Sequence, residues 1–193
     1  MSLVVLVDEK GDSFFDKEGR LATIDKFEAH RRGLRHSAVS VFIFNGKNEL
    51  LLQKRSSDKY HSAGLWANTC CTHPLPGEAP IAGAQRRLRE EMGLTADLTE
   101  LFTFSYRADV GNGLIENEYD YVFGGISKRD PLPNPTEVSD WAWINLKELE
   151  QSLMVNPARY CVWLTRCFRE VIQTLGVIRK TPQLPGKGQK SRI

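Results

Sequence analysis

Hydrophobic and polar positions along the chain predict a series of strands between a few helices. Two apolar runs flank Asn45-Gly46, a dipeptide typical of a tight hairpin turn. Two longer runs flank Gly111-Asn112-Gly113 and indicate a second pair of strands joined by a turn. Strands are therefore expected at residues 3–8, 38–44, 50–55, 101–108, 114–126 and 140–144.

Helical spacing of apolar residues marks the remaining elements. Ala84, Leu88 and Met92 share one side of a helix that begins near Pro80 and ends at Gly93. Further helices are expected at 146–153 and from Pro157 to Gly176, and residues 24–32 form a short helix or an irregular arm. The pattern predicts a mixed β-sheet flanked by helices, in one compact α/β (α+β) domain over residues 1–178.

The net charge of +2 conceals an uneven distribution. After Glu170 the chain has no acid but five bases, so the remainder is acidic on balance. An acidic body argues against a broad nucleic-acid surface. We expect residues 179–193 to be a solvated, flexible basic tail. Its bases are Arg179, Lys180, Lys187, Lys190 and Arg192.

The lengths of the apolar runs and the spacing of the cysteines indicate the cellular location of the protein. No run approaches the ~18 residues of a membrane span, and the run at 3–7 is too short for a signal-peptide core. The four cysteines form no CxxC pair, so we do not expect a disulfide framework. We therefore expect a cytoplasmic location. They are Cys70, Cys71, Cys161 and Cys167.

One segment places a thiol beside an imidazole. In an extended Asn68–Pro74, Cys71 and His73 point to one side and Cys70 to the other. Such a pair is either a reactive cysteine or a buried cysteine that happens to precede a histidine.

A second segment places Glu116, Glu118 and Asp120 on one face of a strand. This face is either solvated or holds a divalent cation, with one oxygen left for proton transfer. His30 and His36 follow no standard zinc spacing, and each alone could be a surface residue. Three histidines and two acids would nevertheless make an octahedral N/O site.

The helix at 80–93 carries Arg86, Arg87, Glu90 and Glu91, which could simply form ion pairs on an exposed face. The R-x-x-x-E-E-x-G pattern also follows the second half of a Nudix box. In that alignment Glu78 matches the early Glu of the box, whereas Arg87 occupies the position of a Glu that commonly binds metal. This exchange argues against standard Nudix diphosphate hydrolysis.

In combination, these elements resemble the type I isopentenyl diphosphate isomerases, metal-dependent enzymes with a Nudix-like fold. The resemblance spans roughly residues 1–170. The most specific match is N-x-x-C-x-H-P, beginning at Asn68, followed by E-N-E at 116–118. The resemblance implies interconversion of isopentenyl and dimethylallyl diphosphate, in isoprenoid biosynthesis, through protonation of an alkene and loss of another proton from a carbocation.

The resemblance also implies roles for individual residues, and it leaves His61 without one. Cys71 and Glu118 match the two acid/base groups, Tyr106 a tyrosine near the acid, and Trp163 an indole over the reacting carbons. Diphosphate-binding cations are matched by Lys26, Arg55, Lys59 and Arg87. The ligands of a first metal (Mn²⁺, Zn²⁺ or Mg²⁺) are matched by His30, His36, His73, Glu116 and Glu118. Glu91 matches a ligand of a second Mg²⁺ that is bound to the substrate diphosphate.

The implied partners are the small-molecule substrate and these metals. No flavin or nicotinamide cofactor and no binding to nucleic acid or membrane is expected. We expect the protein to be a monomer or a weak dimer. Two alternatives stay open on the sequence alone. The retained carboxylates of the helix at 80–93 suggest a Nudix-type hydrolase of a nucleoside or isoprenoid diphosphate. The basic tail suggests a non-enzymatic metal- or nucleic-acid-binding module, which the acidic body disfavours.

Overall fold

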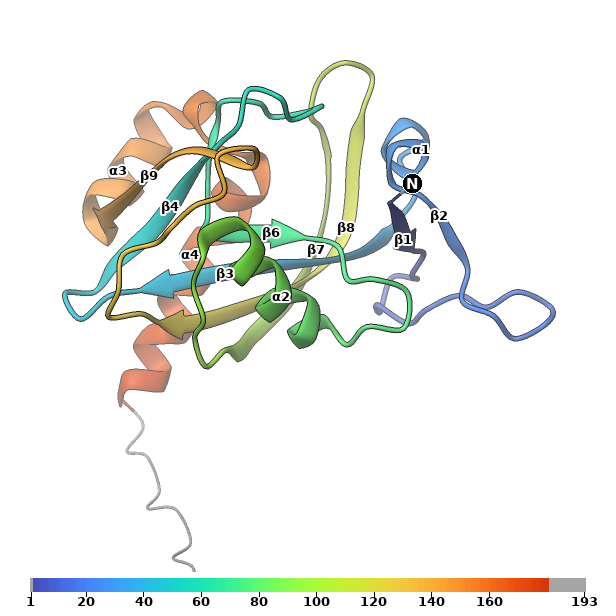
Figure 1. The fold of residues 1–193 in the computed structure, drawn as a ribbon, viewed down its shortest axis with the longest axis horizontal. Coiled ribbons are helices and arrows are strands. Elements are labelled where there is room, and N and C mark those ends of the chain that lie inside the picture. The colour runs from blue at the N-terminus through green and yellow to red at the C-terminus, as the bar shows by residue number, and fades with distance from the viewer. Residues whose placement is uncertain (1, 181–193) are drawn as a thin grey trace, which may run out of the picture.

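Two parallel strands, β3 and β8, form the centre of a seven-stranded mixed sheet (Figure 1). The computed structural model describes residues 2–180, with side chains described as far as residue 176. All other strand pairs of the sheet are antiparallel. Its strands are β3 (His36–Phe44), β4 (Glu49–Arg55), β5 (Trp66–Ala67), β6 (Cys70–Thr72), β7 (Thr99–Asp109), β8 (Ile115–Ile126) and β9 (Val138–Asn145).

The sheet divides on one side of β3. Strand β6 pairs with the middle of β3, whereas β4 joins β3 only near the hairpin turn, where Phe44 pairs with Leu50. Strand β4 then pairs with β5 and β9 instead. A cavity is lined by residues of β3, β4, β6 and β8.

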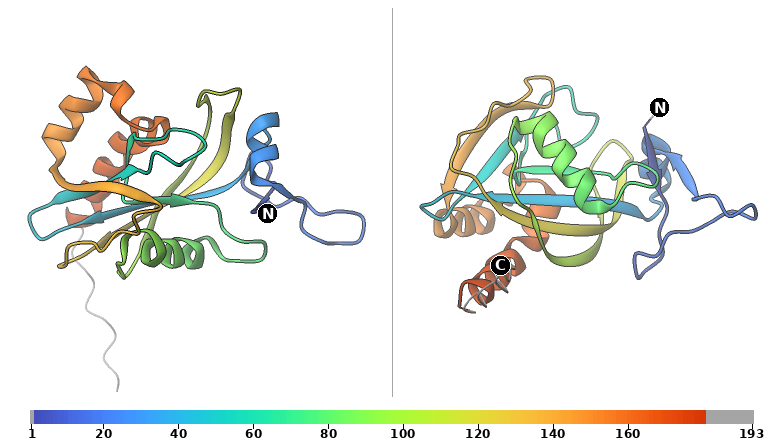
Figure 2. Two further views of the ribbon diagram at one scale, coloured as in Figure 1. Left: turned by 45° about the horizontal axis from the view of Figure 1, so that its top comes forward. Right: turned by 60° about the horizontal axis from the view of Figure 1, so that its bottom comes forward.

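Helices cover both faces of the sheet, and each face has its own apolar core (Figure 2). Helix α2 (Pro80–Met92) packs on one face through Ala84, Leu88 and Met92, as its periodicity predicts. Helices α3 (Leu146–Val155) and α4 (Val162–Lys180) cover the other face, where Leu149 and Leu164 are fully buried. The α/β architecture expected from the sequence is confirmed.

The C-terminal helix differs from the prediction at both ends. Pro157 opens a short 3₁₀ helix, η1 (Pro157–Arg159), and α4 begins only at Val162. Helix α4 also continues through Gly176, since a glycine inside a helix costs only about 1 kcal/mol when the flanking residues favour helix. The expected boundary after residue 178 therefore falls within α4. Residues 181–193, most of the predicted tail, lie outside the described part.

At the N-terminus, β1 (Leu3–Val5) and β2 (Thr23–Asp25) form a separate two-stranded sheet. Helix α1 (Lys26–Arg32) follows, so this segment is a helix and not an irregular arm. The Asp25 carboxylate caps α1 by accepting hydrogen bonds from the Phe27 and Glu28 amides, and Gly33 ends it in the left-handed conformation at φ 60°. Among the helices of residues 2–180, none has the length and hydropathy of a bilayer span.

Candidate active site

Strand register aligns three of the predicted site residues in one row across the sheet. On the parallel strands β3 and β8, His36 lies beside Glu118. On the antiparallel pair of β7 and β8, Tyr106 lies opposite Glu118. Glu116 projects from the same face of β8 as Glu118 because side chains alternate along a strand. Both glutamates are buried, which excludes the interpretation of a solvated acidic face.

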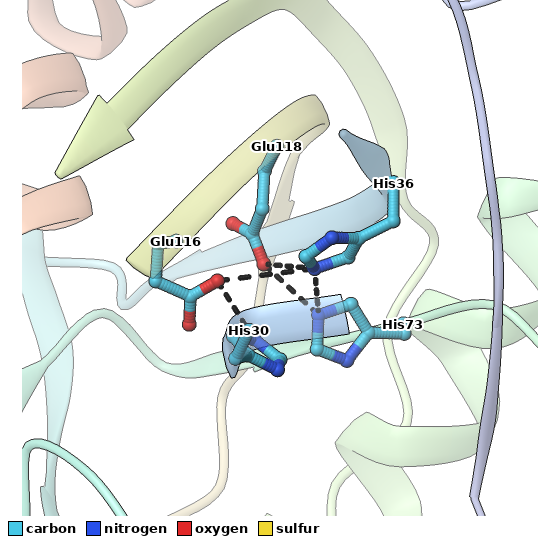
Figure 3. A group of neighbouring side chains, drawn as sticks. All are labelled: His30, His36, His73, Glu116 and Glu118. Atoms are coloured by element: carbon cyan, nitrogen blue, oxygen red, sulfur yellow. Dashed lines mark hydrogen bonds and ion pairs between the residues drawn. The ribbon is translucent and has the colours of Figure 1, made fainter. Parts of the chain in front are cut away.

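His30 from α1 and His73, which follows β6, complete a group of five side chains (Figure 3). One ligand atom from each of His30, His36, His73, Glu116 and Glu118 lies within 4.8 Å of all the others. Nε2 of His30 is 2.9 Å from Oε2 of Glu116, and Nε2 of His73 is 2.9 Å from Oε1 of Glu118. We refer to these residues as the His/Glu group.

The hydrogen bonds of the Nδ1 atoms indicate which ring nitrogen of His30 and His36 carries the proton. Nδ1 of His30 lies 2.5 Å from the Lys26 carbonyl oxygen, and Nδ1 of His36 lies 2.8 Å from the Leu34 carbonyl oxygen. A carbonyl only accepts, so both Nδ1 atoms carry the proton and both Nε2 atoms direct a lone pair inward. Nε2 of His36 and His73 are 3.1 Å apart. Converging nitrogen and carboxylate donors of this kind fit a divalent cation.

Burial sets the charge of the group. It lowers the pKa of His73 to about 4 and also lowers the pKa of His30, so both imidazoles are neutral near pH 7, as ligation requires. Burial and the neighbouring Glu118 raise the pKa of Glu116 well above its usual range. Burial acts in the same direction on the pKa of Glu118, but the hydrogen bond between His73 and Oε1 of Glu118 outweighs it and holds that pKa well below the usual range.

Cys71 faces the same cavity from β6, on the far side of β3 from Glu118. Burial raises the pKa of its thiol well above 9, although Arg55 acts in the opposite direction. Nη1 of Arg55 lies 3.9 Å from Sγ of Cys71. The neighbouring Cys70 is fully buried in the core beneath α2. The two cysteines thus face opposite ways, as the extended segment predicts, and Cys71 holds a proton in this environment.

Tyr106 contacts the other candidate acid/base group. Its hydroxyl donates a hydrogen bond of 2.5 Å to Oε2 of Glu118, while Oε1 of Glu118 faces His73. Burial, followed by the charge of Glu118, raises the pKa of Tyr106 well above 10, so the phenol remains a donor. Each oxygen of Glu118 therefore has a defined environment.

The four predicted cations all line this cavity. Arg55 is 7 % exposed and forms no ion pair with an acid of residues 2–176. Its Nε is buried without a hydrogen-bond partner, and Nη2 donates to the His61 carbonyl at 3.2 Å. Burial, then Lys59 and Arg87, lowers the pKa of Lys26. Like charges crowded at a cavity with an unpartnered donor fit an anionic ligand.

Lys59 and Arg87 share Glu137, an acid that the sequence did not single out. Oε2 of Glu137 contacts Nζ of Lys59, and Oε1 is 3.2 Å from Nη2 of Arg87. Glu137 comes from the segment before β9, so this contact joins three distant parts of the chain. No local pattern identifies it, because it depends only on where the segments fold.

Glu91 lies on the same cavity but apart from the His/Glu group. Its Oε1 accepts hydrogen bonds from Nε and Nη2 of Arg87 at 3.1 and 2.6 Å, and Oε2 accepts one from Gln53. The other carboxylates of the box are also paired with arginines: Glu78 with Arg86, and Glu90 with both.

Trp163 lies near the start of α4 and closes one wall of the cavity. Its indole Nε1 donates to Oδ1 of Asn68 at 3.0 Å, which ties α4 to the segment between β5 and β6. The Arg55 guanidinium lies 5.3 Å from the ring centroid. The structure thus brings the predicted Trp163 to the same cavity as Cys71 and Glu118.

His61 is a second site residue to which the sequence assigned no role. It is buried, lines the cavity, and places Nε2 at 3.2 Å from Oε1 of Glu116. Burial, then the positive charge of Arg55, lowers the pKa of His61 to about 3, so its ring is neutral. The preceding Tyr60 contacts His30. The only signal in the sequence is that an aromatic-histidine dipeptide interrupts an otherwise polar loop.

Comparisons with known proteins identify the family of this chain. Residues 34–163 match the NUDIX domain family. The chain is 50 % identical over 169 residues to isopentenyl-diphosphate Delta-isomerase 1 of Aromatoleum aromaticum, covering 88 % of this chain and 92 % of that protein. It is 45 % identical to the isopentenyl-diphosphate Delta-isomerase of Pectobacterium atrosepticum over 87 % of this chain and 90 % of that one.

Solved structures confirm the fold at much lower identity. DR0079 from Deinococcus radiodurans superimposes with a TM-score of 0.68 at 17 % identity, over 87 % of this chain and 98 % of that chain. A MutT protein from Methanosarcina mazei superimposes with a TM-score of 0.60 at 21 % identity, over 76 % of this chain and 96 % of that chain. On the sequence matches and this fold, the chain belongs to the isopentenyl-diphosphate Delta-isomerase family of NUDIX-domain proteins.

Proposed function

We propose that this enzyme interconverts isopentenyl diphosphate and dimethylallyl diphosphate by moving a carbon–carbon double bond. The observation that carries the proposal is the shared cavity. Cys71 and Glu118 approach it from either side of β3, and four cations surround it. A diphosphate needs the cations, and a bond shift by proton addition and removal needs two acid/base groups.

Substrate binding rests on the buried Arg55, whose Nε has no hydrogen-bond partner, together with Lys26, Lys59 and Arg87. The diphosphate compensates their charges and competes with Glu137 for Lys59 and Arg87. Because the diphosphate lies remote from the reacting carbons, its binding energy holds the alkene between Cys71 and Glu118.

The proton steps balance with no reactant other than solvent, which restores the protonation states of Cys71 and Glu118 between turnovers. For isopentenyl diphosphate, one group delivers a proton to the terminal CH₂ carbon and leaves a tertiary carbocation. The second group removes a proton from the neighbouring chain CH₂, and the electron pair of that C–H bond becomes the new double bond. The reverse reaction exchanges the roles of Cys71 and Glu118. No electron is gained or lost overall, so neither a flavin nor a nicotinamide is needed.

Two further side chains support these steps. The Tyr106 hydroxyl keeps a hydrogen bond on Glu118 while its charge changes. The Trp163 ring faces the cavity, where an aromatic face stabilises a desolvated cation by up to about 2 kcal/mol. An apolar wall also excludes water that would trap the carbocation.

The His/Glu group holds the first metal in this proposal. Three imidazoles favour Mn²⁺ or Zn²⁺, and the carboxylates also tolerate Mg²⁺. When bound, the cation fixes the position of Glu118 and tunes its acidity. Glu91, which accepts a hydrogen bond from Arg87, is the ligand that we propose for a second Mg²⁺ that arrives with the diphosphate.

The cysteines suggest where the enzyme works. None of the four cysteines forms a disulfide, and the chemistry depends on a free thiol at Cys71. A reducing cytoplasm preserves that thiol, and we propose this location for the enzyme. The substrate is the only partner that the proposal requires, and a monomer or a weak dimer would suffice.

A Nudix-type hydrolysis has less support. It depends on carboxylates that gather metals and activate water. In α2, Arg86 and Arg87 instead pair with Glu78, Glu90 and Glu91. The two relatives named above are isomerases, and hydrolysis gives no role to the thiol of Cys71.

The test is conversion of isopentenyl diphosphate with Mg²⁺ and Mn²⁺ supplied, with phosphate release followed in parallel. We expect isomerisation without phosphate release. Cys71→Ala should reduce kcat by about 10²–10⁴-fold, the usual contribution of general acid–base catalysis. Cys70→Ala is the matched control and should retain kcat within a few-fold, because Cys70 faces the core. Phosphate release faster than isomerisation, or an active Cys71→Ala variant, would contradict the proposal.

A further inference from the structure

The loop between β4 and β5 reaches into the His/Glu group through two consecutive residues, Tyr60 and His61. Nε2 of His61 lies 3.2 Å from Oε1 of Glu116, and both side chains are buried. The other oxygen of Glu116, Oε2, faces Nε2 of His30 at 2.9 Å. In Figure 3 only this oxygen of Glu116 points toward the other members of the group. Each oxygen of the Glu116 carboxylate therefore contacts one histidine, His61 or His30.

His61 is itself fixed in place. Its backbone carbonyl accepts a hydrogen bond from Nη2 of Arg55 at 3.2 Å, and Nδ1 lies 3.2 Å from the Ser62 hydroxyl. The Tyr60 ring packs edge-on against the imidazole, with centroids 4.5 Å apart. If Nδ1 accepts from Ser62, the neutral ring keeps its proton on Nε2 and donates it to Glu116.

The role of a metal ligand does not fit His61. The five-residue group defined by ligand atoms within 4.8 Å of one another excludes it. A carboxylate on a metal rotates between its two equivalent oxygens unless an outer partner holds one of them. Such outer partners orient ligands and typically contribute 10–100-fold to metal affinity.

We infer that His61 is a positioning residue that holds Oε1 of Glu116 so that Oε2 stays directed into the His/Glu group. This inference rests on the proposed metal at that group. It also links the loop that carries Lys59 to the metal ligands, because His61 contacts Glu116 by its side chain and Arg55 by its carbonyl.

The test is direct titration of the metal-free protein with Mn²⁺, following free Mn²⁺ by electron paramagnetic resonance. His61→Ala should weaken the Kd for Mn²⁺ by about 10–100-fold. His61→Gln carries an amide N–H at the position of Nε2 and should stay within a few-fold of wild type. His61→Asn is too short to reach Glu116 and should behave like His61→Ala. Ser57→Ala, an exposed change in the same loop, is the control.

The outcomes are separable. If wild type binds no Mn²⁺, the proposed metal centre fails. If wild type binds but His61→Ala binds equally well, the positioning role fails. Should His61→Ala not fold, the Gln and Asn variants decide, since equal Kd values for those two would overturn the inference. Thermal unfolding of each metal-free variant separates a loss of ligand alignment from a loss of structure.

Discussion

Tyr106 donates a hydrogen bond of 2.5 Å to the carboxylate of Glu118. Tyr106→Phe removes the hydroxyl while preserving the ring, which stacks on Phe104. A hydrogen bond to a charged group contributes about 1.5–3 kcal/mol, so we expect kcat to fall roughly 10–100-fold. KM should stay nearly constant, because the phenol does not contact the diphosphate cations. Steady-state kinetics that show a raised KM at normal kcat would contradict this role.

Residue types drew attention to much of the site, but only the resemblance assigned roles to the individual residues. The structure places Cys71, Glu118, Tyr106, Trp163 and the four cations around one cavity, and His73 and Glu116 join the cavity to His30 and His36 of the His/Glu group. His61 and Glu137 received no role from the sequence for a physical reason. Each acts through a contact between segments distant in the sequence, and neither belongs to a motif with regular spacing.

At the scale of elements, α4 reaches the cavity through Trp163. Trp163→Phe keeps an aromatic face but leaves the buried Oδ1 of Asn68 without its donor. We expect a loss of about 1–3 kcal/mol in the free energy of unfolding and a modest fall in kcat.

Trp163→Leu should be destabilised by a similar amount, and its kcat should fall by up to roughly 30-fold more, the rate equivalent of about 2 kcal/mol of cation–π stabilisation. Urea unfolding and kinetics on both variants make the comparison. A Leu variant as active as the Phe variant would show that Trp163 serves packing only.

Elements were predictable to different degrees. Alternation and turn residues identified the longer strands, and apolar periodicity identified α2. The parallel pairing of β3 with β8 was not predictable, because their register depends on tertiary packing. That register places His36 beside Glu118. The two-residue strand β5 and the 3₁₀ turn η1 carry too few residues for a periodic signal.

For the whole molecule, buried neutral histidines make the metal-free fold sensitive to acid. The pKa of His73 is about 4 in the folded protein and near 6.5 when exposed. The unfolded chain therefore takes up a proton at His73 before the folded chain does, and stability is lost as pH falls from about 6.5 to about 4.

His73→Gln removes this contribution. The stability difference between wild type and His73→Gln, measured by urea unfolding with chelator present, should therefore decrease as pH falls through that window. A difference that stays constant, or increases toward low pH, would show that His73 is not held neutral by burial.

The central claim is that the double bond moves by proton addition and removal between Cys71 and Glu118. Isopentenyl diphosphate incubated with the metal-loaded enzyme in D₂O tests it by nuclear magnetic resonance. The account predicts dimethylallyl diphosphate with deuterium in the newly formed methyl group, at a rate that Cys71→Ala lowers by about 10²–10⁴-fold and that Cys70→Ala leaves within a few-fold of wild type. Product formed without deuterium, which indicates an internal hydrogen shift, would contradict it.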